Sequence, residues 1–208
     1  MIFHNIQVVY IRRCCSTQGG GVYRNNAIWY SPRNRETFEK YERIIKEIGL
    51  NDIFRGTWID TEEVSILAMF FLVRNHCKSL NMHLDWPDEV HSQILSVLFS
   101  VNEFGVHFAY TDVDGKEHKY KYEVGKGIAF GGGFWHSTDV GESDHDDILF
   151  NIYIGAAEIP DDEDLWYQFL WGTDDEMQAY MHPSKGFVRH EWYKGDKDVC
   201  LEETLDEL

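Results

Sequence analysis

Two histidines and one aspartate are the candidate metal ligands of this sequence. His83 and Asp85 lie two residues apart in NMHLDW, and His136 follows much later in GGGFWHSTDVG. Residues i and i+2 of a β-strand point to the same face, so a strand here would project His83 and Asp85 together. Two imidazoles and one carboxylate suit Fe(II) in non-haem oxygenases, because open positions remain for further ligands. The simpler alternative is that the three are unconnected polar residues on an edge strand and in a turn.

The residues between Asp85 and His136 have the composition of a β-protein. They contain four short segments rich in Val, Ile, Phe and Tyr, which read ILSVLFSV, FGVHFAYTD, KYKYEV and GIAFGG. Gly and Asp-Gly turns separate several of these segments, and strands at such close spacing indicate an antiparallel sandwich or barrel. Four strands are enough to wind a small barrel and return His136 beside the first strand. The sequence therefore predicts a mainly β fold with flanking helices (α+β).

The regions on either side of this core are predicted to be largely helical. A helix is expected within residues 31–49, where Ser31 or Asn34 can cap its start and Gly49 can end it. A second helix is expected at 60–74, although its continuous apolar run could also be a buried strand. The C-terminal region is expected to form short helices at 161–171 and 174–181 and an extended piece at 186–193.

The length of 208 residues suits one domain. We expect a single domain over 1–208, with an N-terminal strand and helices at 1–78, the β core at 79–155, and an acidic C-terminal helical extension at 156–208.

The charge and composition of the chain indicate which kinds of partner and which cellular compartment to expect. The net charge is −17, and residues 141–208 hold 19 Asp/Glu against 4 Lys/Arg. A surface this acidic repels phosphates, so nucleic acid and anionic membranes are not expected partners. No apolar run reaches the length of a membrane span, and the first charges follow the N-terminal apolar stretch, the reverse of a secretory signal. The four cysteines show no zinc or disulfide spacing, which favours reduced thiols and a cytoplasmic location.

The histidine-bearing segment also resembles a known family. GKGIAFGGGFWHSTDVGES is similar to the glycine-rich strand, turn and distal histidine of the 2-oxoglutarate/Fe(II)-dependent dioxygenase superfamily. The resemblance covers about residues 79–155 and implies a double-stranded β-helix, a jelly-roll or cupin-like core. It implies His83, Asp85 and His136 as iron ligands, Fe(II) and 2-oxoglutarate as cofactors, and hydroxylase activity on a small molecule or a protein side chain. Asn151 resembles the asparagine that the JmjC-like and asparaginyl-hydroxylase branch carries on its last core strand.

One feature of that family is missing from the sequence. Most members hold the distal carboxylate of 2-oxoglutarate with an Arg about ten residues after the distal histidine, or with a Lys on the strand after H-x-D. A dianion is costly to bury without such a partner. Neither STDVGESDHDDILFNIYIG nor WPDEVHSQILSVLFSVNEFG contains Lys or Arg. The candidate replacements are Arg74, Lys119 and Lys121, with Tyr110 or Tyr120 as hydrogen-bond donors.

The sequence also offers two candidate pocket residues and leaves two other functions open. Trp86 and Trp135 each adjoin a proposed ligand and could form a wall of a substrate pocket. The missing basic residue leaves open a cupin-type metalloenzyme that does not use 2-oxoglutarate. A non-catalytic jelly-roll that binds a ligand or partner is the third possibility.

Overall fold

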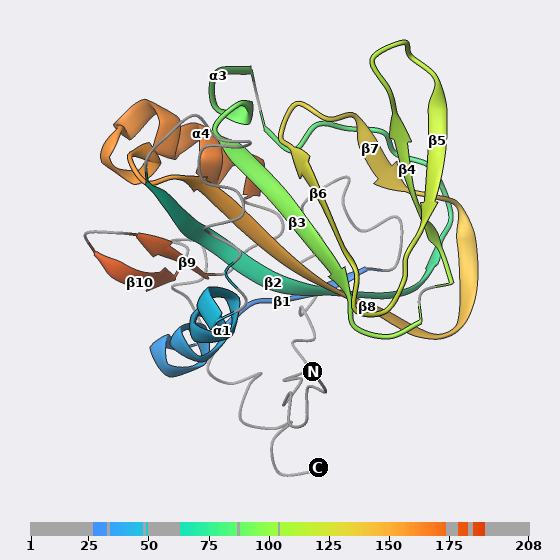
Figure 1. Ribbon diagram of the computed structural model, residues 1–208, viewed down its shortest axis with the longest axis horizontal. Helices are drawn as coiled ribbons and strands as arrows, with labels where there is room; N and C mark the ends of the chain where they lie inside the picture. Colours follow the sequence, from blue (N-terminus) through green and yellow to red (C-terminus); the bar gives the residue numbers. More distant parts are fainter. Residues whose placement is uncertain are drawn as a thin grey trace, which may run out of the picture.

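The fold is built on two antiparallel β-sheets. Figure 1 presents the computed structural model, which describes residues 27–32, 34–47, 49, 63–86, 88–103, 105–173, 179–182 and 185–189. The larger sheet has the strand order β1 (Ile28–Tyr30), β2 (Val64–Cys77), β8 (Gly141–Ala156), β3 (Ile94–Ser100) and β6 (Gly127–Gly131). The smaller sheet has the order β5 (Glu117–Lys121), β4 (His107–Thr111) and β7 (His136–Thr138). The strand expected at the N-terminus of the chain lies outside the described residues.

The chain between Asp85 and His136 forms four strands, as predicted. It passes through β3, β4, β5 and β6 before β7 begins at His136. Because β3 and β6 belong to the larger sheet and β4 and β5 to the smaller one, this path winds between the two sheets. The mainly β, jelly-roll fold class expected from the sequence is therefore confirmed.

Strand β2 corrects the expectation of a helix at 60–74. The part of that segment that the structure describes is a strand paired with β8 over most of its length. Phe70 and Leu72 face the space between the two sheets, whereas Phe71 packs on the opposite side against Tyr41 and Phe150. Because both faces are covered, β2 has no polar alternation, and its apolar run could not be told from a buried helix.

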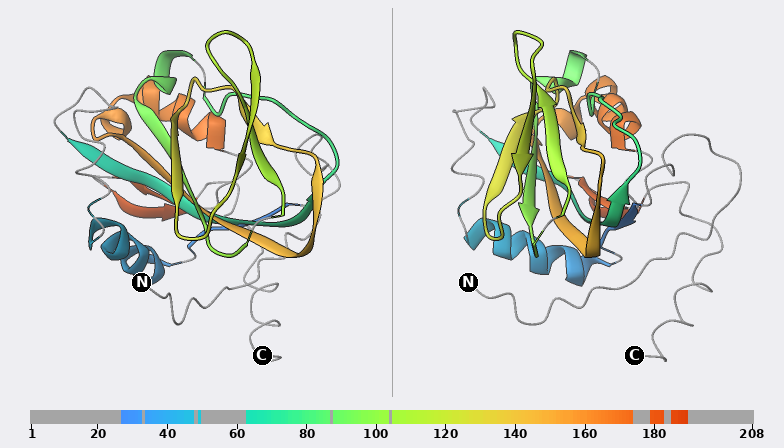
Figure 2. Two further views of the ribbon diagram at one scale, coloured as in Figure 1. Left: turned by 45° about the vertical axis from the view of Figure 1, so that its right-hand side comes forward. Right: turned by 90° about the vertical axis from the view of Figure 1, so that its right-hand side faces the viewer.

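Helix α1 (Arg35–Glu47) lies on the outer face of the larger sheet, away from the space between the sheets (Figure 2). Of the two candidate caps, Ser31 and Asn34, the structure shows Asn34, whose Oδ1 accepts a hydrogen bond from the Thr37 N–H at 2.8 Å. Gly49 ends the helix at φ +70°, a left-handed conformation that favours glycine, and its N–H donates to the Lys46 carbonyl. Phe38 and Ile45 bury the apolar stripe of the helix.

The C-terminal region contributes a helix and a hairpin. After a 3-10 turn at Ile159–Asp161, α4 (Glu163–Thr173) confirms the first predicted helix and lies at the end of the sheets near the short helix α3 (Asp88–His91) (Figure 1). The second predicted helix is wrong where the structure describes it, because Ala179–His182 is strand β9 and pairs with β10 (Gly186–Arg189). In the described part of the chain, no helix is long and apolar enough to cross a membrane. The single-domain boundaries stay a prediction.

Candidate metal centre

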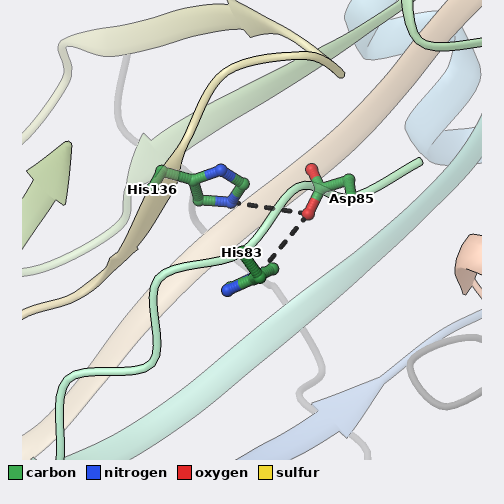
Figure 3. Close-up of side chains that lie close together, drawn as sticks. All are labelled: His83, Asp85 and His136. Carbon is green, nitrogen blue, oxygen red and sulfur yellow. Dashed lines mark ion pairs between the residues drawn. The ribbon is translucent and has the colours of Figure 1, made fainter. Parts of the chain in front are cut away.

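His83, Asp85 and His136 come together at the wall of the space between the sheets, as Figure 3 shows. Their ligand atoms all lie within 4.8 Å of one another. The Asp85 Oδ1 atom is 3.6 Å from Nε2 of His83 and 3.4 Å from Nε2 of His136. Ligands at right angles around an ion with bonds of about 2.1 Å lie about 3 Å apart, so only a small movement would close the three atoms on a metal.

The backbone fixes the two histidines opposite each other. His136 is the first residue of β7, and it forms an isolated antiparallel bridge with His83. The His83 N–H donates to the His136 carbonyl at 2.9 Å, and the His136 N–H donates back at 3.1 Å. The strand expected to carry His83 and Asp85 is reduced to this one bridge, and Asp85 lies in the bend that follows. The pair therefore lies in a one-residue bridge and a bend, not in a continuous strand.

Both imidazoles are oriented by the main chain. Nδ1 of His83 lies 2.7 Å from the Asn81 carbonyl oxygen, and Nδ1 of His136 lies 2.8 Å from the Phe134 carbonyl oxygen. A carbonyl only accepts hydrogen bonds, so each Nδ1 carries a proton, and Nε2 is the ring nitrogen that is left to bind a metal. Two ring nitrogens and one carboxylate oxygen therefore face one another. These three atoms can each donate an electron pair, and together they form a ligand set that suits a transition-metal cation.

Burial favours the neutral imidazole of His136, which is the form that can bind a metal. Its side chain is about one-tenth exposed, and desolvation lowers the pKa of His136, although the Asp85 carboxylate acts in the opposite direction. The imidazole is therefore neutral at neutral pH. The His83 side chain is 42% exposed and lies nearer the solvent. The group thus has one buried and one accessible imidazole.

A serine that was not among the predicted site residues donates a hydrogen bond to the Asp85 oxygen that faces away from the histidines. The Ser96 hydroxyl on β3 donates to Asp85 Oδ2 at 2.8 Å, and Ser96 is almost completely buried. This bond leaves Oδ1 directed at the histidines. Two serines, Ser96 and Ser100, interrupt the apolar strand ILSVLFS, but sequence alone could not show which residue either of them contacts.

We expect Ser96→Ala to weaken metal binding by about 10-fold to 100-fold, because Asp85 loses the bond that orients it. Isothermal titration of the purified protein with Mn(II) measures the affinity. Ser100→Ala is the matched control, since Ser100 is also buried on β3 but donates to the Asn102 carbonyl. Equal losses in the two variants would mean that β3 is generally perturbed and that Ser96 does not position Asp85.

The three side chains line a cavity of about 700 Å³ between the two sheets. This volume lies within the range of small-molecule binding sites. The larger sheet supplies one wall through one alternating set of side chains on β2, β3 and β8, and the smaller sheet supplies Phe108, His136 and Thr138. Segment 79–85 and Trp29 of β1 also reach the cavity. The candidate metal ligands therefore face an interior with room for a ligand.

Of the four residues predicted to bind the cosubstrate, the structure brings two to the cavity. Arg74 on β2 and Asn151 on β8 are both buried and line it together with the three ligands. Tyr110 instead stacks on His118 and Phe134, outside the lining.

The lysine candidates point away from the cavity. Lys121 is exposed on β5, and Lys119 is 63% exposed in an ion pair with Asp139. Both belong to the outward-facing set of that strand. The inward set ends at Tyr122, a buried cavity residue that the sequence analysis did not select.

Neither tryptophan lines the cavity. Trp86 is 2% exposed and packs in the core against Tyr153 and Phe169, so it supports the cavity wall only through Tyr153. Trp135 precedes the inward-facing His136 in the chain and is 51% exposed. Neither residue is part of the cavity lining, and their role in a substrate pocket stays a prediction.

Comparison with known proteins identifies the fold. No family model and no curated protein matches the sequence. HygX from Streptomyces hygroscopicus, solved with nickel and 2-oxoglutarate bound, is similar in structure with a TM-score of 0.50 at 11% identity, over 67% of this chain and 73% of that chain.

Two further structures are similar at lower scores. A Pseudomonas putida prolyl-4-hydroxylase has a TM-score of 0.45 at 18% identity, over 62% of this chain and 71% of that chain. An oxidoreductase of the 2OG-Fe(II) oxygenase family from Burkholderia pseudomallei has a TM-score of 0.48 at 14% identity, over 57% of this chain and 56% of that chain. The similarity to HygX shows a shared fold alone, and within this fold the chain brings the residues of an H-x-D…H motif together.

Proposed function

We propose that the protein is a non-haem Fe(II), 2-oxoglutarate-dependent oxygenase that hydroxylates an unidentified substrate. The observation that carries the proposal is the convergence of three acceptors, Nε2 of His83, Nε2 of His136 and Oδ1 of Asp85, at the wall of a cavity. Two imidazoles and a carboxylate suit Fe(II) and leave coordination positions for other ligands. A bound Fe(II) would supply the oxygen chemistry, which side chains alone cannot perform.

The residues around the ligands suit the binding of a polar cosubstrate. Tyr122 is fully buried, and desolvation raises the pKa of its phenol, which therefore remains a hydrogen-bond donor at neutral pH. The apolar side chains of Phe70, Leu72 and Leu98 form much of the remaining wall. Such a wall limits the access of water to the reacting groups.

The substrate that we propose is a small molecule or a single protein side chain. The cavity is large enough for a small molecule in addition to a cosubstrate of five carbons. The net charge of −17 disfavours nucleic acid and anionic membranes as partners. Cys77 is a buried free thiol, in keeping with the reducing cytoplasm that we propose as the compartment.

The test is succinate release from 2-oxoglutarate by the purified full-length protein. We expect release to require both Fe(II) and 2-oxoglutarate, to stop when a chelator removes the metal, and to be absent in Asp85→Ala. Protein that binds Fe(II) through these residues but neither binds nor consumes 2-oxoglutarate would instead be a cupin-type metalloenzyme. Protein that binds no metal would be a jelly-roll binding protein, and the proposal would be wrong.

A further inference from the structure

We infer that Ser137 is a positioning residue for His83, the more accessible of the two histidine ligands. The Ser137 hydroxyl takes the place of a direct main-chain hydrogen bond between β7 and the segment that carries His83. This leaves the Asn81 carbonyl free to orient the His83 ring. The inference rests on the proposed function, because Ser137 has this role only if His83 binds the metal.

His83 needs such support because its segment is barely paired. Within the described residues, one isolated bridge, that of His83 with His136, joins segment 79–85 to β7. The His83 side chain is 42% exposed, against 10% for His136, so packing holds its ring much less tightly. The orientation of the ring therefore depends on the hydrogen bond from its Nδ1 to the Asn81 carbonyl at 2.7 Å.

Ser137 replaces the next pair of main-chain bonds along the ladder. In an antiparallel ladder, pairs of residues that exchange two hydrogen bonds recur at every second position of each strand. His83 and His136 form one such pair, and the next would join Asn81 to Thr138. The Asn81 N–H instead donates to Ser137 Oγ at 3.1 Å, and the Ser137 hydroxyl donates to the Thr138 carbonyl at 2.9 Å. One hydroxyl therefore bridges two main-chain groups that would otherwise meet directly.

The inserted hydroxyl frees the carbonyl that His83 uses. A direct pair of Asn81 with Thr138 would engage the Asn81 carbonyl with a main-chain N–H. Because the Ser137 hydroxyl lies in between, this carbonyl accepts the hydrogen bond from the His83 ring. Ser137 thus fixes the chain at Asn81, and its neighbour His136 fixes the main chain of His83. Two successive residues of β7 together set the direction of the imidazole.

The position of the Ser137 hydroxyl is itself well defined. Ser137 is 4% exposed and lines the cavity, and its hydroxyl is used both as a donor and as an acceptor. The thiol of Cys77 lies 3.4 Å from the Ser79 carbonyl oxygen and 3.5 Å from the Thr138 carbonyl oxygen, and adds a weaker contact where the segment begins. Side chains therefore hold the segment on β7 where a continuous ladder does not.

Ser137→Ala is expected to bind Mn(II) about 10-fold more weakly than the parent protein. Without the hydroxyl, the Asn81 N–H can pair directly with the Thr138 carbonyl, which draws the Asn81 carbonyl away from His83. The free Mn(II) signal in electron paramagnetic resonance, recorded with purified full-length protein, measures the affinity even where binding is weak. Ser100→Ala removes a buried hydroxyl outside the cavity lining and should stay within about twofold of the parent protein.

Two further substitutions at this position separate the hydrogen bond from the space that the side chain fills. Ser137→Cys keeps nearly the same size but presents a much weaker acceptor, so it should lose affinity as Ser137→Ala does. Ser137→Thr keeps the hydroxyl and suits a strand, so it should bind Mn(II) within about threefold of the parent protein. Ser137→Cys decides the inference if Ser137→Ala does not fold, as judged by circular dichroism.

A second background distinguishes positioning of His83 from general support of β7. In His83→Ala protein, Asp85 and His136 remain to bind the ion, but no imidazole is left for Asn81 to orient. We therefore expect Ser137→Ala to change the affinity of His83→Ala protein by less than about twofold. A residue that merely supported β7 would displace His136 when removed, and the same loss would then persist in this background.

The possible failures are separable. If the parent protein binds Mn(II) and releases succinate with Fe(II), while Ser137→Ala and Ser137→Cys keep full affinity, the role inferred for Ser137 is wrong and the proposed function stands. Equal losses in the two backgrounds, or in Ser137→Thr and Ser137→Ala, would likewise overturn the inference. If the parent protein binds no Mn(II), the proposed metal centre fails, and the role of Ser137 fails with it.

Discussion

His136→Ala is expected to bind Mn(II) on the order of 1,000-fold more weakly than the parent protein, because the change removes a ligand and not merely a group that orients one. His136 is the more buried of the two histidines. Apart from His83, Asp85 and His136, no His, Cys, Asp or Glu is among the described residues that line the cavity, so no such ligand is at hand to replace its Nε2. Isothermal titration gives the affinity. The thermal midpoint of the metal-free variant, followed by circular dichroism, reports whether the fold is kept.

His107→Ala is the matched control for this prediction. His107 is half-buried on β4 of the same small sheet, but it does not line the cavity, because the side chain facing inward there is Phe108. We expect its metal affinity to equal that of the parent protein. Full metal binding by His136→Ala, or an equal loss in His107→Ala, would remove His136 from the list of ligands.

The largest expected effect on stability comes from Phe169→Ala, which should lower the free energy of unfolding by about 3–5 kcal/mol. Phe169 is fully buried on α4, with ring centroids 5.2 Å from Trp166, 6.1 Å from Trp86 and 6.5 Å from Tyr153. Its removal leaves a cavity that these rings cannot fill without moving. Denaturant titration followed by tryptophan fluorescence measures the change.

Tyr167→Ala is the control on the same helix. Tyr167 is 70% exposed, so its truncation should change the free energy of unfolding by less than about 0.5 kcal/mol. A similar loss in both variants would show that helix propensity, and not the packing of Phe169, is responsible. Because Trp86 follows Asp85 directly, folded Phe169→Ala protein should also bind Mn(II) less tightly than Tyr167→Ala protein.

The candidate ligands could be predicted from the sequence because both parts of the signal are local. The pair His83 and Asp85 is a short motif, and His136 follows a glycine-rich turn after a run of β-type segments. The number of strands between them was also correct, since turns with Gly and Asp mark their ends. Helix α1 could be predicted from its end signals, since Asn34 caps its start and Gly49 follows its end.

The predictions fail in two situations. One is an element with both faces buried, and the other is a residue whose role depends on the direction of its side chain. β2 is covered by the cavity on one side and α1 on the other, so its sequence lacks the alternation that identifies a strand. Lys119 and Lys121 were candidates beside Arg74, but both lie on the outward-facing side of β5, whereas Arg74 on β2 lines the cavity. Trp86 and Trp135 were selected for proximity along the chain, which says nothing about the face on which each ring lies.

The main-chain pairing of His83 with His136 bears on whether the protein folds before it binds a metal. Since each residue donates its N–H to the carbonyl of the other, the spacing of the two rings is set as soon as the barrel has folded. An ion that arrives after synthesis would meet a finished site, and a chelator could strip it without dismantling the sheets.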